Sequence, residues 1–211
     1  MIHELRIYTY RQGAVPEVIK DSATLSRDIR GDRYGKLEGY WFTDIGPLNR
    51  VVHLWSYTDL NERARLRAEL ARNERWTREY APLHKDVTVR QDIRLMNPVI
   101  GPAAPAETPN VYELRTYRTR PGAVRRWVEL ITKAMPVREK YSRPVGLWIT
   151  EAGQPNEVCH IWPYRDLNHR AAVRAAAAAD PEWQIFLRDS APLLDEMHST
   201  IMLPAPHSPL R

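Results

Sequence analysis

The chain has 211 residues, a formal net charge of +5 at pH 7 and 43% apolar residues, which is typical of a folded protein with one large domain or two small ones. No apolar run is long enough to span a bilayer, and a single cysteine, Cys159, excludes an internal disulfide. Arginines dominate the basic residues, but they alternate with acids and form no run of like charge. We therefore expect a cytoplasmic protein with no signal peptide, no membrane span and no nucleic-acid partner.

The same sequence pattern occurs twice. The stretch His-Glu-Leu-Arg-Ile-Tyr at 3–8 returns as Tyr-Glu-Leu-Arg-Thr-Tyr at 112–117, and Val-Val-His-Leu-Trp-Ser-Tyr at 51–57 returns as Val-Cys-His-Ile-Trp-Pro-Tyr at 158–164. Two copies of this length indicate a duplicated domain and not a solenoid. The chain is predicted to contain repeat 1 over residues 1–97, a proline-rich linker over 98–109, repeat 2 over 110–204 and a C-terminal tail over 205–211.

Each repeat is predicted to run strand, helix, strand, strand, helix, strand. Apolar and polar residues alternate over 2–10 and 111–119, as they do in a half-buried strand. The next segment of each repeat has a stripe of residues at helical spacing. The stripes comprise Val18, Ser22, Leu25 and Ile29 in repeat 1 and Val124, Trp127, Val128, Ile131 and Met135 in repeat 2.

Turn and cap residues place the remaining elements. Residues 44–49 form a hairpin turn between the second and third strands of repeat 1. Asp59 is predicted to cap the next helix, with Glu62 as its capping-box partner. Asp180 and Pro181 are predicted to begin a helix in repeat 2. The final strands are predicted near 87–95 and 199–203.

The order β-α-β-β-α-β is that of a ferredoxin-like unit, in which both helices cover one face of the sheet. Two such units leave two bare sheet faces, which can cover each other and close an eight-stranded barrel. We therefore predict an α+β fold in which two ferredoxin-like units pack sheet to sheet as an intrachain dimeric α+β barrel.

Period-two alternation divides each strand into two faces. We expect the aliphatic faces, and Cys159 with them, to lie under the helices, and the polar and aromatic faces to point into the barrel interior. The tryptophans of the second strands are assigned to the polar faces by the same rule. The polar faces comprise Glu4, Arg6, Tyr8, Trp41, His53, Trp55 and Tyr57 in repeat 1 and Glu113, Arg115, Tyr117, Trp148, His160, Trp162 and Tyr164 in repeat 2.

These residue types suit proton transfer on a small, flat molecule. A histidine exchanges protons near neutral pH, an arginine can hold an enolate oxygen, and a carboxylate beside the histidine would set its tautomer and raise its pKa. We therefore predict a small-molecule site in the barrel. Its predicted catalytic residues are His53, His160, Arg6, Arg115, Glu4, Glu113, Tyr8 and Tyr117, with His53 or His160 as general base, and its predicted substrate-binding residues are Trp41, Trp55, Trp148 and Trp162.

Simpler interpretations stay open. The glutamate and arginine of each first strand would also serve as ion pairs that only tie the sheets together, and each histidine as a packed strand residue. No phosphate-binding loop, dinucleotide fingerprint or zinc-binding helix motif occurs, so we expect no metal and no cofactor. His53 with Glu4 is the pair that could hold a metal, and His53 or His160 could ligate haem.

Three motifs carry a resemblance: Glu-Leu-Arg-x-Tyr, which occurs in both repeats, and Gly-Tyr-Trp and Pro-Leu-Asn-x-Val-Val-His-Leu-Trp-x-Tyr, which occur in repeat 1 and have variant forms in repeat 2. Together they resemble the NIPSNAP family, over nearly the whole chain and twice. The resemblance implies the dimeric α+β barrel superfamily, whose members include cofactor-free monooxygenases, polyketide cyclases, isomerases and haem enzymes. Roles proposed within the family lie in vesicle handling, mitochondrial quality control and bacterial secondary metabolism. Thr116 and Pro163 depart from the family pattern, which would suit a pseudo-dimer with one active pocket.

Two functions remain open at this point. The first is a cofactor-independent enzyme that acts on a small aromatic or polyketide-like molecule by proton transfer, cyclisation or oxygenation. The second is a non-catalytic binding or assembly module with an ion-paired barrel core. Either function is compatible with a homo-oligomer of pseudo-dimeric chains.

Overall fold

The computed structural model of the protein describes residues 1–105, 108 and 111–211. The chain forms two compact units: unit 1 comprises residues 1–96 and 203–211, and unit 2 comprises residues 97–202. Residues 106, 107 and 109 of the predicted linker and residue 110, the predicted start of repeat 2, lie outside the described residues.

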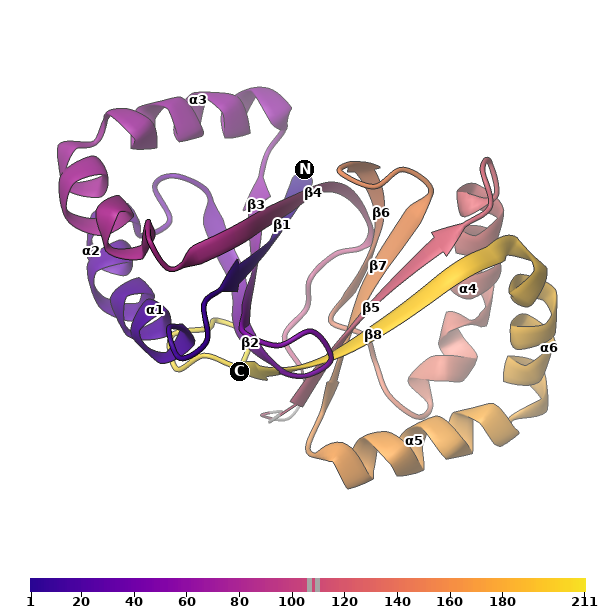
Figure 1. Cartoon of the computed structure of the whole chain (residues 1–211). Coiled ribbons are helices and arrows are strands. Elements are labelled where there is room, and N and C mark those ends of the chain that lie inside the picture. Colours follow the sequence, from indigo (N-terminus) through magenta and orange to yellow (C-terminus); the bar gives the residue numbers. More distant parts are fainter. Residues whose placement is uncertain (106–107, 109–110) are drawn as a thin grey trace. The chain divides into compact units, whose positions relative to one another are not determined.

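Unit 1 has the predicted order of elements. They are β1 (Ile2–Tyr10), α1 (Val15–Asp21), a π-helical turn (Ser22–Ser26), α2 (Arg27–Arg30), β2 (Lys36–Ile45), β3 (Arg50–Tyr57), α3 (Leu60–Arg72), a second π-helical turn (Trp76–Tyr80), a 3-10 turn (Ala81–His84) and β4 (Thr88–Ile100). The strands pair antiparallel in the order β4-β1-β3-β2. The helices α1, α2 and α3 lie on one face of these strands (Figure 1).

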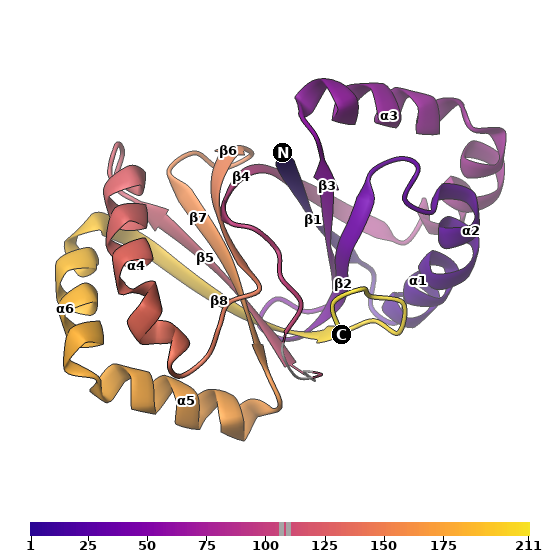
Figure 2. The same cartoon turned by 180° about the vertical axis from the view of Figure 1, so that it is seen from behind.

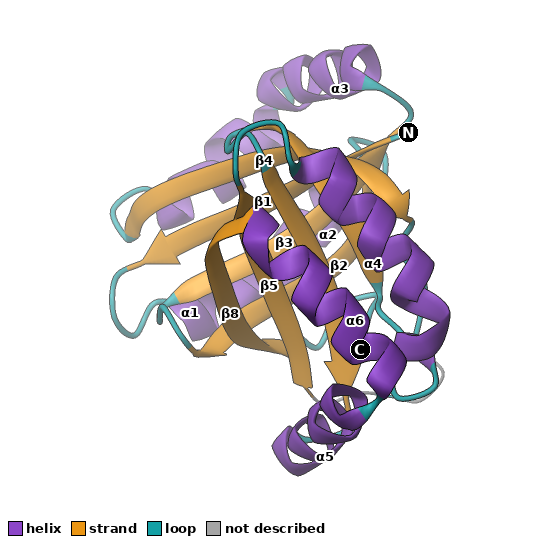
Figure 3. Ribbon diagram, turned by 90° about the vertical axis from the view of Figure 1, so that its right-hand side faces the viewer, coloured by secondary structure: helices purple, strands orange, loops and turns teal. Residues whose placement is uncertain are grey.

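Unit 2 repeats this order without the π-helical turns. Its elements are β5 (Val111–Thr119), α4 (Val124–Glu139), β6 (Gly146–Ala152), β7 (Glu157–Tyr164), α5 (Leu167–Ala179), α6 (Pro181–Ser190), a 3-10 turn (Ala191–Leu193) and β8 (Leu194–Pro204). The strands pair antiparallel in the order β6-β7-β5-β8. In the reverse view α4, α5 and α6 lie on one side of the strands of unit 2 (Figure 2). The helices α4 and α6 lie side by side (Figure 3).

The eight strands are hydrogen-bonded in the order β1-β3-β2-β8-β5-β7-β6-β4, which closes on itself. The predicted α+β fold, with two ferredoxin-like units in an eight-stranded intrachain barrel, is confirmed. Across the described residues, no helix combines the length and the apolar character that crossing a membrane requires.

Aspartate caps begin the helices where the sequence predicts them. The Asp59 carboxylate accepts the backbone N–H of Glu62 at 2.8 Å and begins α3. The Asp180 carboxylate accepts backbone N–H groups in the first turn of α6, where Pro181 lacks an N–H that would need a partner. Both predicted helix starts are confirmed.

Residues 98–100 of the predicted linker and several residues of the predicted tail are part of the fold of the chain. Strand β4 continues through Pro98 to Ile100, so the stretch predicted as a linker begins as a strand. In unit 1, the backbone N–H of Tyr40 donates to Ser208 Oγ at 2.9 Å, and the backbone N–H of Ala205 donates to the Tyr40 carbonyl at 3.0 Å. The C-terminal residues therefore form a strap along β2.

The register between strands assigns the sheet faces in unit 1. Residues directly opposite each other in antiparallel strands share a face. His53 lies opposite Arg6 on β1 and opposite Tyr40 on β2, whereas Trp41 lies opposite Val52. The prediction that Trp41 shares the face of His53 is wrong, because alternation within a strand does not fix which residues face each other between strands.

The same correction applies in unit 2. Trp148 lies opposite Cys159, whereas His160 lies opposite Arg115. Trp148 therefore does not share the face of His160. Since the helices of unit 2 cover the His160 face, as the lining of its cavity shows below, the prediction that Cys159 lies under the helices is also wrong.

Candidate functional site

A cavity of about 540 Å³ lies in unit 1 between the sheet and the helical segments. The polar face of the sheet forms one wall, so the prediction that this face points into the barrel interior is wrong. The helices that cover it are rich in polar residues and can therefore meet a polar sheet face. The lining includes Arg6, Tyr8, Tyr10, Tyr40, His53 and Trp55 from the strands, and Ser22, Ser26, Arg30, Arg67, Trp76, Tyr80 and His84 from the helical side.

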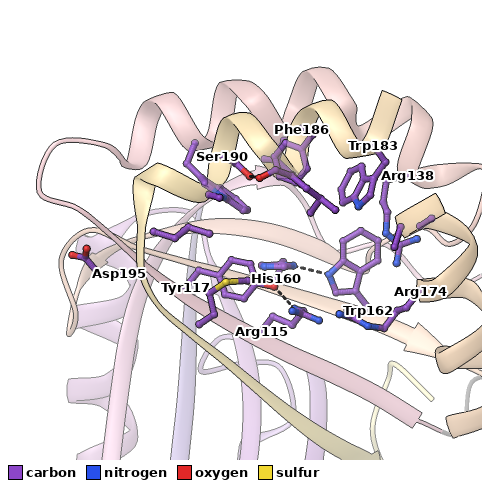
Figure 4. Close-up of a pocket in the computed structure, with 18 residues that line it drawn as sticks. Arg115, Tyr117, Arg138, His160, Trp162, Arg174, Trp183, Phe186, Ser190 and Asp195 are labelled. Atoms are coloured by element: carbon purple, nitrogen blue, oxygen red, sulfur yellow. Dashed lines mark hydrogen bonds between the residues drawn. The ribbon is translucent and has the colours of Figure 1, made fainter. Parts of the chain in front are cut away.

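Unit 2 has a cavity of about 400 Å³ in the equivalent place. Figure 4 shows Phe186 and Trp183 of α6 facing His160, Tyr117 and Trp162 of the strands. Apolar residues make up more of this lining than in unit 1. They include Ile131, Phe186, Leu187, Leu194 and Met197.

Each cavity contains a histidine that is held in one tautomer. Trp55 Nε1 donates a hydrogen bond to His53 Nδ1 at 2.6 Å, and Trp162 Nε1 donates to His160 Nδ1 at 2.6 Å. An indole N–H can only donate, so Nδ1 must be the unprotonated nitrogen. The neutral ring then carries its proton on Nε2, where it can donate a hydrogen bond.

Burial and neighbouring arginines keep both histidines neutral. Burial, followed by the charge of Arg115, lowers the pKa of His160 to about 3. Burial, followed by the charges of Arg6 and Arg30, lowers the pKa of His53 well below its ordinary value. The prediction that a nearby carboxylate raises the pKa is wrong, because desolvation and cationic neighbours outweigh it. Each neutral histidine therefore has one donor, Nε2–H, and a general-base role for His53 or His160 stays a prediction.

The glutamates of the first strands lie beside three arginines each. Glu113 is fully buried, with Arg115 Nη1 at 2.9 Å, Arg170 Nη2 at 2.7 Å and Arg174 Nη1 at 3.7 Å. Burial raises the pKa of Glu113, but the hydrogen bond from Arg170 and the charge of Arg115 outweigh it and lower the pKa to about 2.

Glu4 has the same environment in unit 1, where it pairs with Arg6, Arg63 and Arg67. In each unit one carboxylate thus offsets one of three guanidinium charges. The cavity wall keeps an excess of positive charge, which favours an anionic ligand.

A further arginine lies against the tryptophan of each cavity. The Arg30 guanidinium lies 3.4 Å from the ring centre of Trp55, and the Arg138 guanidinium lies 4.4 Å from that of Trp162. Burial lowers the pKa of Arg30 to about 10, so it remains charged at neutral pH. Cation–π contacts of this kind fix the arginine in place while its N–H groups stay available.

Unit 1 also contains polar contacts that join its helical segments to one another and to β2. Ser22 Oγ lies 2.8 Å from the Tyr40 hydroxyl and 2.9 Å from the Tyr80 hydroxyl, which links three side chains in a chain of hydrogen bonds. His84 Nε2 lies 3.0 Å from Asp21 Oδ2. The ring of His84 also makes an edge contact with Tyr80.

The family profile that matches this sequence is that of NIPSNAP, over residues 3–100 and again over 112–209. The chain belongs to the NIPSNAP family. Protein NipSnap homolog 2 from Homo sapiens is 31% identical over 184 residues, which cover 83% of this chain and 62% of the human protein. The chain thus spans less than two thirds of that relative's length.

Solved structures of proteins that carry other descriptions share the fold of this NIPSNAP chain. A proposed monooxygenase from Fusobacterium nucleatum superposes with a TM-score of 0.71 at 10% identity, over 97% of this chain and 92% of that one. An anthrone oxidase-like protein superposes with a TM-score of 0.65 at 10% identity, over 96% and 90%. At such low identity these likenesses show the fold alone.

The two cavities of this NIPSNAP chain bring together part of the predicted site. Of the predicted residues, Arg6, Tyr8, His53 and Trp55 line the first cavity, and Arg115, Tyr117, His160 and Trp162 line the second. Glu4 and Glu113 are buried behind their arginines and line neither cavity. Trp41 and Trp148 lie on the other sheet face.

Several cavity residues were not predicted from the sequence. The helices contribute Ser22, Arg30, Tyr80 and His84 in unit 1 and Arg138, Arg174, Trp183 and Phe186 in unit 2. One signal was present: Arg63 and Arg67, like Arg170 and Arg174, are four residues apart, which places both on one helix face. Across the part of the chain that the structure describes, no three His, Cys, Asp or Glu side chains gather closely enough to hold a metal ion.

Proposed function

We propose that unit 1 is a cofactor-independent enzyme site for a small aromatic or polyketide-like carbonyl compound, which it converts to an enolate or phenolate. The observation that carries this proposal is the pairing, around one cavity, of oxyanion donors with a histidine–carboxylate pair. The fold that the chain shares with a proposed monooxygenase and an anthrone oxidase-like protein is compatible with the proposal.

The donor side of the cavity would hold the developing oxyanion. His53 carries its proton on Nε2, because Nδ1 accepts the indole N–H of Trp55. Arg6 lines the same cavity and supplies a guanidinium charge. Donors that are already in place before the reaction stabilise an enolate without reorganisation, which is the largest single contribution in many enzymes.

The base side would remove the proton. When Asp21 accepts a hydrogen bond from His84 Nε2–H, the Nδ1 of His84 is left as a free acceptor. A proton on the carbon next to the substrate carbonyl would pass to His84 Nδ1, and the electron pair of the broken C–H bond would move into the enolate. Asp21 would stabilise the resulting imidazolium. Return of the proton to another carbon completes an isomerisation, and attack of the enolate carbon on a second carbonyl completes a cyclisation.

Deuterium exchange of 2-tetralone in D2O, followed by NMR, tests the proposal. The protein should accelerate exchange next to the carbonyl, and His84→Ala should reduce the catalysed rate by about 10²- to 10⁴-fold. The matched control is His198→Ala, since His198 is exposed and lines neither cavity. Equal exchange rates for His84→Ala and the parent, at equal melting temperature, would overturn the assignment of His84.

The alternative is a non-catalytic module whose glutamate–arginine clusters are structural. The three arginines around each buried glutamate favour it, because Arg170 and Arg174 fasten α5 to β5 in unit 2. Under this alternative, truncation of Arg6 or Arg115 lowers the melting temperature strongly and costs no ligand affinity. An unchanged melting temperature would count against it.

A further inference from the structure

The cavity of unit 2 lacks the proposed base of unit 1. Helix α6 and the 3-10 turn behind it contain no histidine, and Leu187 and Ile131 occupy the helical side of the cavity. The one carboxylate in the lining, Asp195, lies beside Arg120 at 3.7 Å and has a side chain that is 37% exposed. This cavity therefore has a different chemical character and needs an explanation of its own.

Three buried donors line the cavity of unit 2 without an acceptor. They are His160 Nε2, Trp127 Nε1 and Arg138 Nη1, and no acceptor lies within hydrogen-bond distance of any of them among the described residues. The three residues are 5%, 1% and 4% exposed. Buried N–H groups almost always have partners, because desolvation without a hydrogen bond is costly. Three such donors around one cavity indicate that a bound molecule supplies the acceptors.

The donors differ in kind but suit one acceptor group. Arg138 is held between the rings of Trp162 and Trp183, at 4.4 and 5.8 Å from the ring centres, and it carries the positive charge. His160 is neutral and donates through Nε2, since its Nδ1 accepts from Trp162. A carboxylate has two oxygens with several lone pairs, which accept from a guanidinium and from neutral N–H groups together.

The apolar residues on the rest of the cavity wall determine which kind of ligand tail the cavity accepts. Ile131, Phe186, Leu187 and Leu194 line the cavity, and Figure 4 shows Phe186 facing the strand residues across it. The volume of about 400 Å³ is within the range of small-molecule sites. An apolar wall opposite a cationic end matches an amphipathic ligand with a single anionic head.

We propose that the cavity of unit 2 binds an amphipathic monocarboxylate, with its head at Arg138, His160 and Trp127 and its aliphatic or aryl tail along Ile131, Phe186 and Leu187. The proposal does not rest on the reaction assigned to unit 1.

Titration calorimetry with decanoate, 1-naphthoate and decanol tests the proposal. Decanoate or 1-naphthoate should bind with one ligand per chain, and decanol, which lacks the charged head, should bind at least tenfold more weakly than decanoate. If 1-naphthoate binds more tightly than decanoate, the tail is aryl; the reverse order makes it aliphatic. Decanol that binds as tightly as both acids would overturn the proposal.

Variants then locate the site. Trp127→Phe keeps an aromatic ring and removes one hydrogen-bond donor. It should lower the affinity for the bound acid by roughly fivefold. Leu187→Asp places a charge in the tail wall at a half-exposed position that tolerates it, and should abolish binding. Tyr80→Phe in the cavity of unit 1 is the matched control and should leave affinity unchanged. Parent-like affinity in both unit 2 variants, or a loss caused by Tyr80→Phe, would overturn the assignment to unit 2.

The two proposals fail separately. Loss of 2-tetralone exchange in His84→Ala should leave carboxylate binding intact, and loss of carboxylate binding in Leu187→Asp should leave exchange intact. A protein that binds neither acid while it still exchanges 2-tetralone contradicts the carboxylate site alone.

Discussion

Glu113→Gln is the change that most directly measures what the buried ion cluster of unit 2 contributes. The substitution would keep the shape of the side chain and remove its charge, leaving Arg115, Arg170 and Arg174 without their counterion. The native-state pKa of Glu113 is lowered from 4.5 to about 2. At about 1.4 kcal/mol per pKa unit, this shift corresponds to roughly 3 kcal/mol of stability at pH 7. Breaking a buried ion pair by removing one partner costs about 3–5 kcal/mol in other proteins, which agrees.

The sign of the pH dependence follows from the direction of the shift. The native-state pKa is below the unfolded-state pKa, so the contribution is fully present above about pH 5 and is lost as the pH falls through about 2. At pH 3.5 the unfolded carboxyl is already mostly protonated, and roughly 2 kcal/mol should remain. The advantage of the parent over Glu113→Gln should therefore shrink as the solution becomes more acidic.

Urea denaturation at pH 7 and pH 3.5, followed by tryptophan fluorescence, measures both quantities. The matched control is Glu129→Gln, because Glu129 pairs with Arg126 on the exposed surface of α4 and its side chain is 65% exposed. That change should alter the free energy of unfolding by less than about 0.5 kcal/mol. A loss below about 1 kcal/mol for Glu113→Gln at pH 7, or a difference that does not shrink at pH 3.5, would refute the reasoning.

Two further measurements test the cavity wall and the opposite sheet face. His160 should remain neutral, with its proton on Nε2, down to about pH 4, because its pKa is lowered to about 3; ¹⁵N chemical shifts of its imidazole measure this, and imidazolium signals at pH 6 would contradict it. Gly39→Ala should cost about 1–3 kcal/mol of unfolding free energy, because a Cβ there would overlap the indole of Trp41. Gly101→Ala, where the new Cβ meets no atom within 4 Å, is the control for the urea measurement and should be neutral within about 0.5 kcal/mol.

Strand patterns in the sequence predicted which neighbours share a face but not which face the helices cover. Within β1, Arg6 and Tyr8 line one cavity together, as a side-chain period of two requires. The composition of the helix that covers the sheet indicates which face it covers. The buried residues of α3 are Leu66 and Leu70, a stripe too narrow to cover an aliphatic sheet face. A helix of that composition needs a polar partner, and Glu4 provides it.

Contacts between helical segments were beyond the reach of sequence patterns. Asp21 and His84 belong to different helical segments, and neither has a neighbour in sequence that marks it as one of a pair. Ser22 Oγ links the hydroxyls of Tyr40 and Tyr80, whereas the sequence placed Ser22 in a stripe of residues at helical spacing. Such pairs depend on how each helix is rotated about its axis over the sheet, and small changes in helix geometry set that rotation.

The π-helical turns supply such a change. Arg30 and Arg138 occupy matching positions, because each contacts a tryptophan in the same way. The difference in residue number between them is one smaller than the difference between Val15 and Val124, where the first helices of the two repeats begin. The extra residue of unit 1 falls in the π-helical turn Ser22–Ser26. A π-helical turn absorbs one inserted residue without rotating the rest of the helix. The residues before and after it keep their faces, and those within it point in new directions.

The second helical region shows the same relation. Trp76 matches Trp183, and Thr88 takes the place of Leu194 in strand pairing. The difference in residue number between the second pair is one smaller than that between the first pair. The intervening segment of unit 1 is the π-helical turn Trp76–Tyr80, which carries the hydroxyl that meets Ser22. The two insertions thus account for the hydroxyl-lined wall of unit 1, while the uninterrupted helices of unit 2 keep an apolar wall. These two insertions distinguish the cavity proposed for proton transfer from the cavity proposed for carboxylate binding.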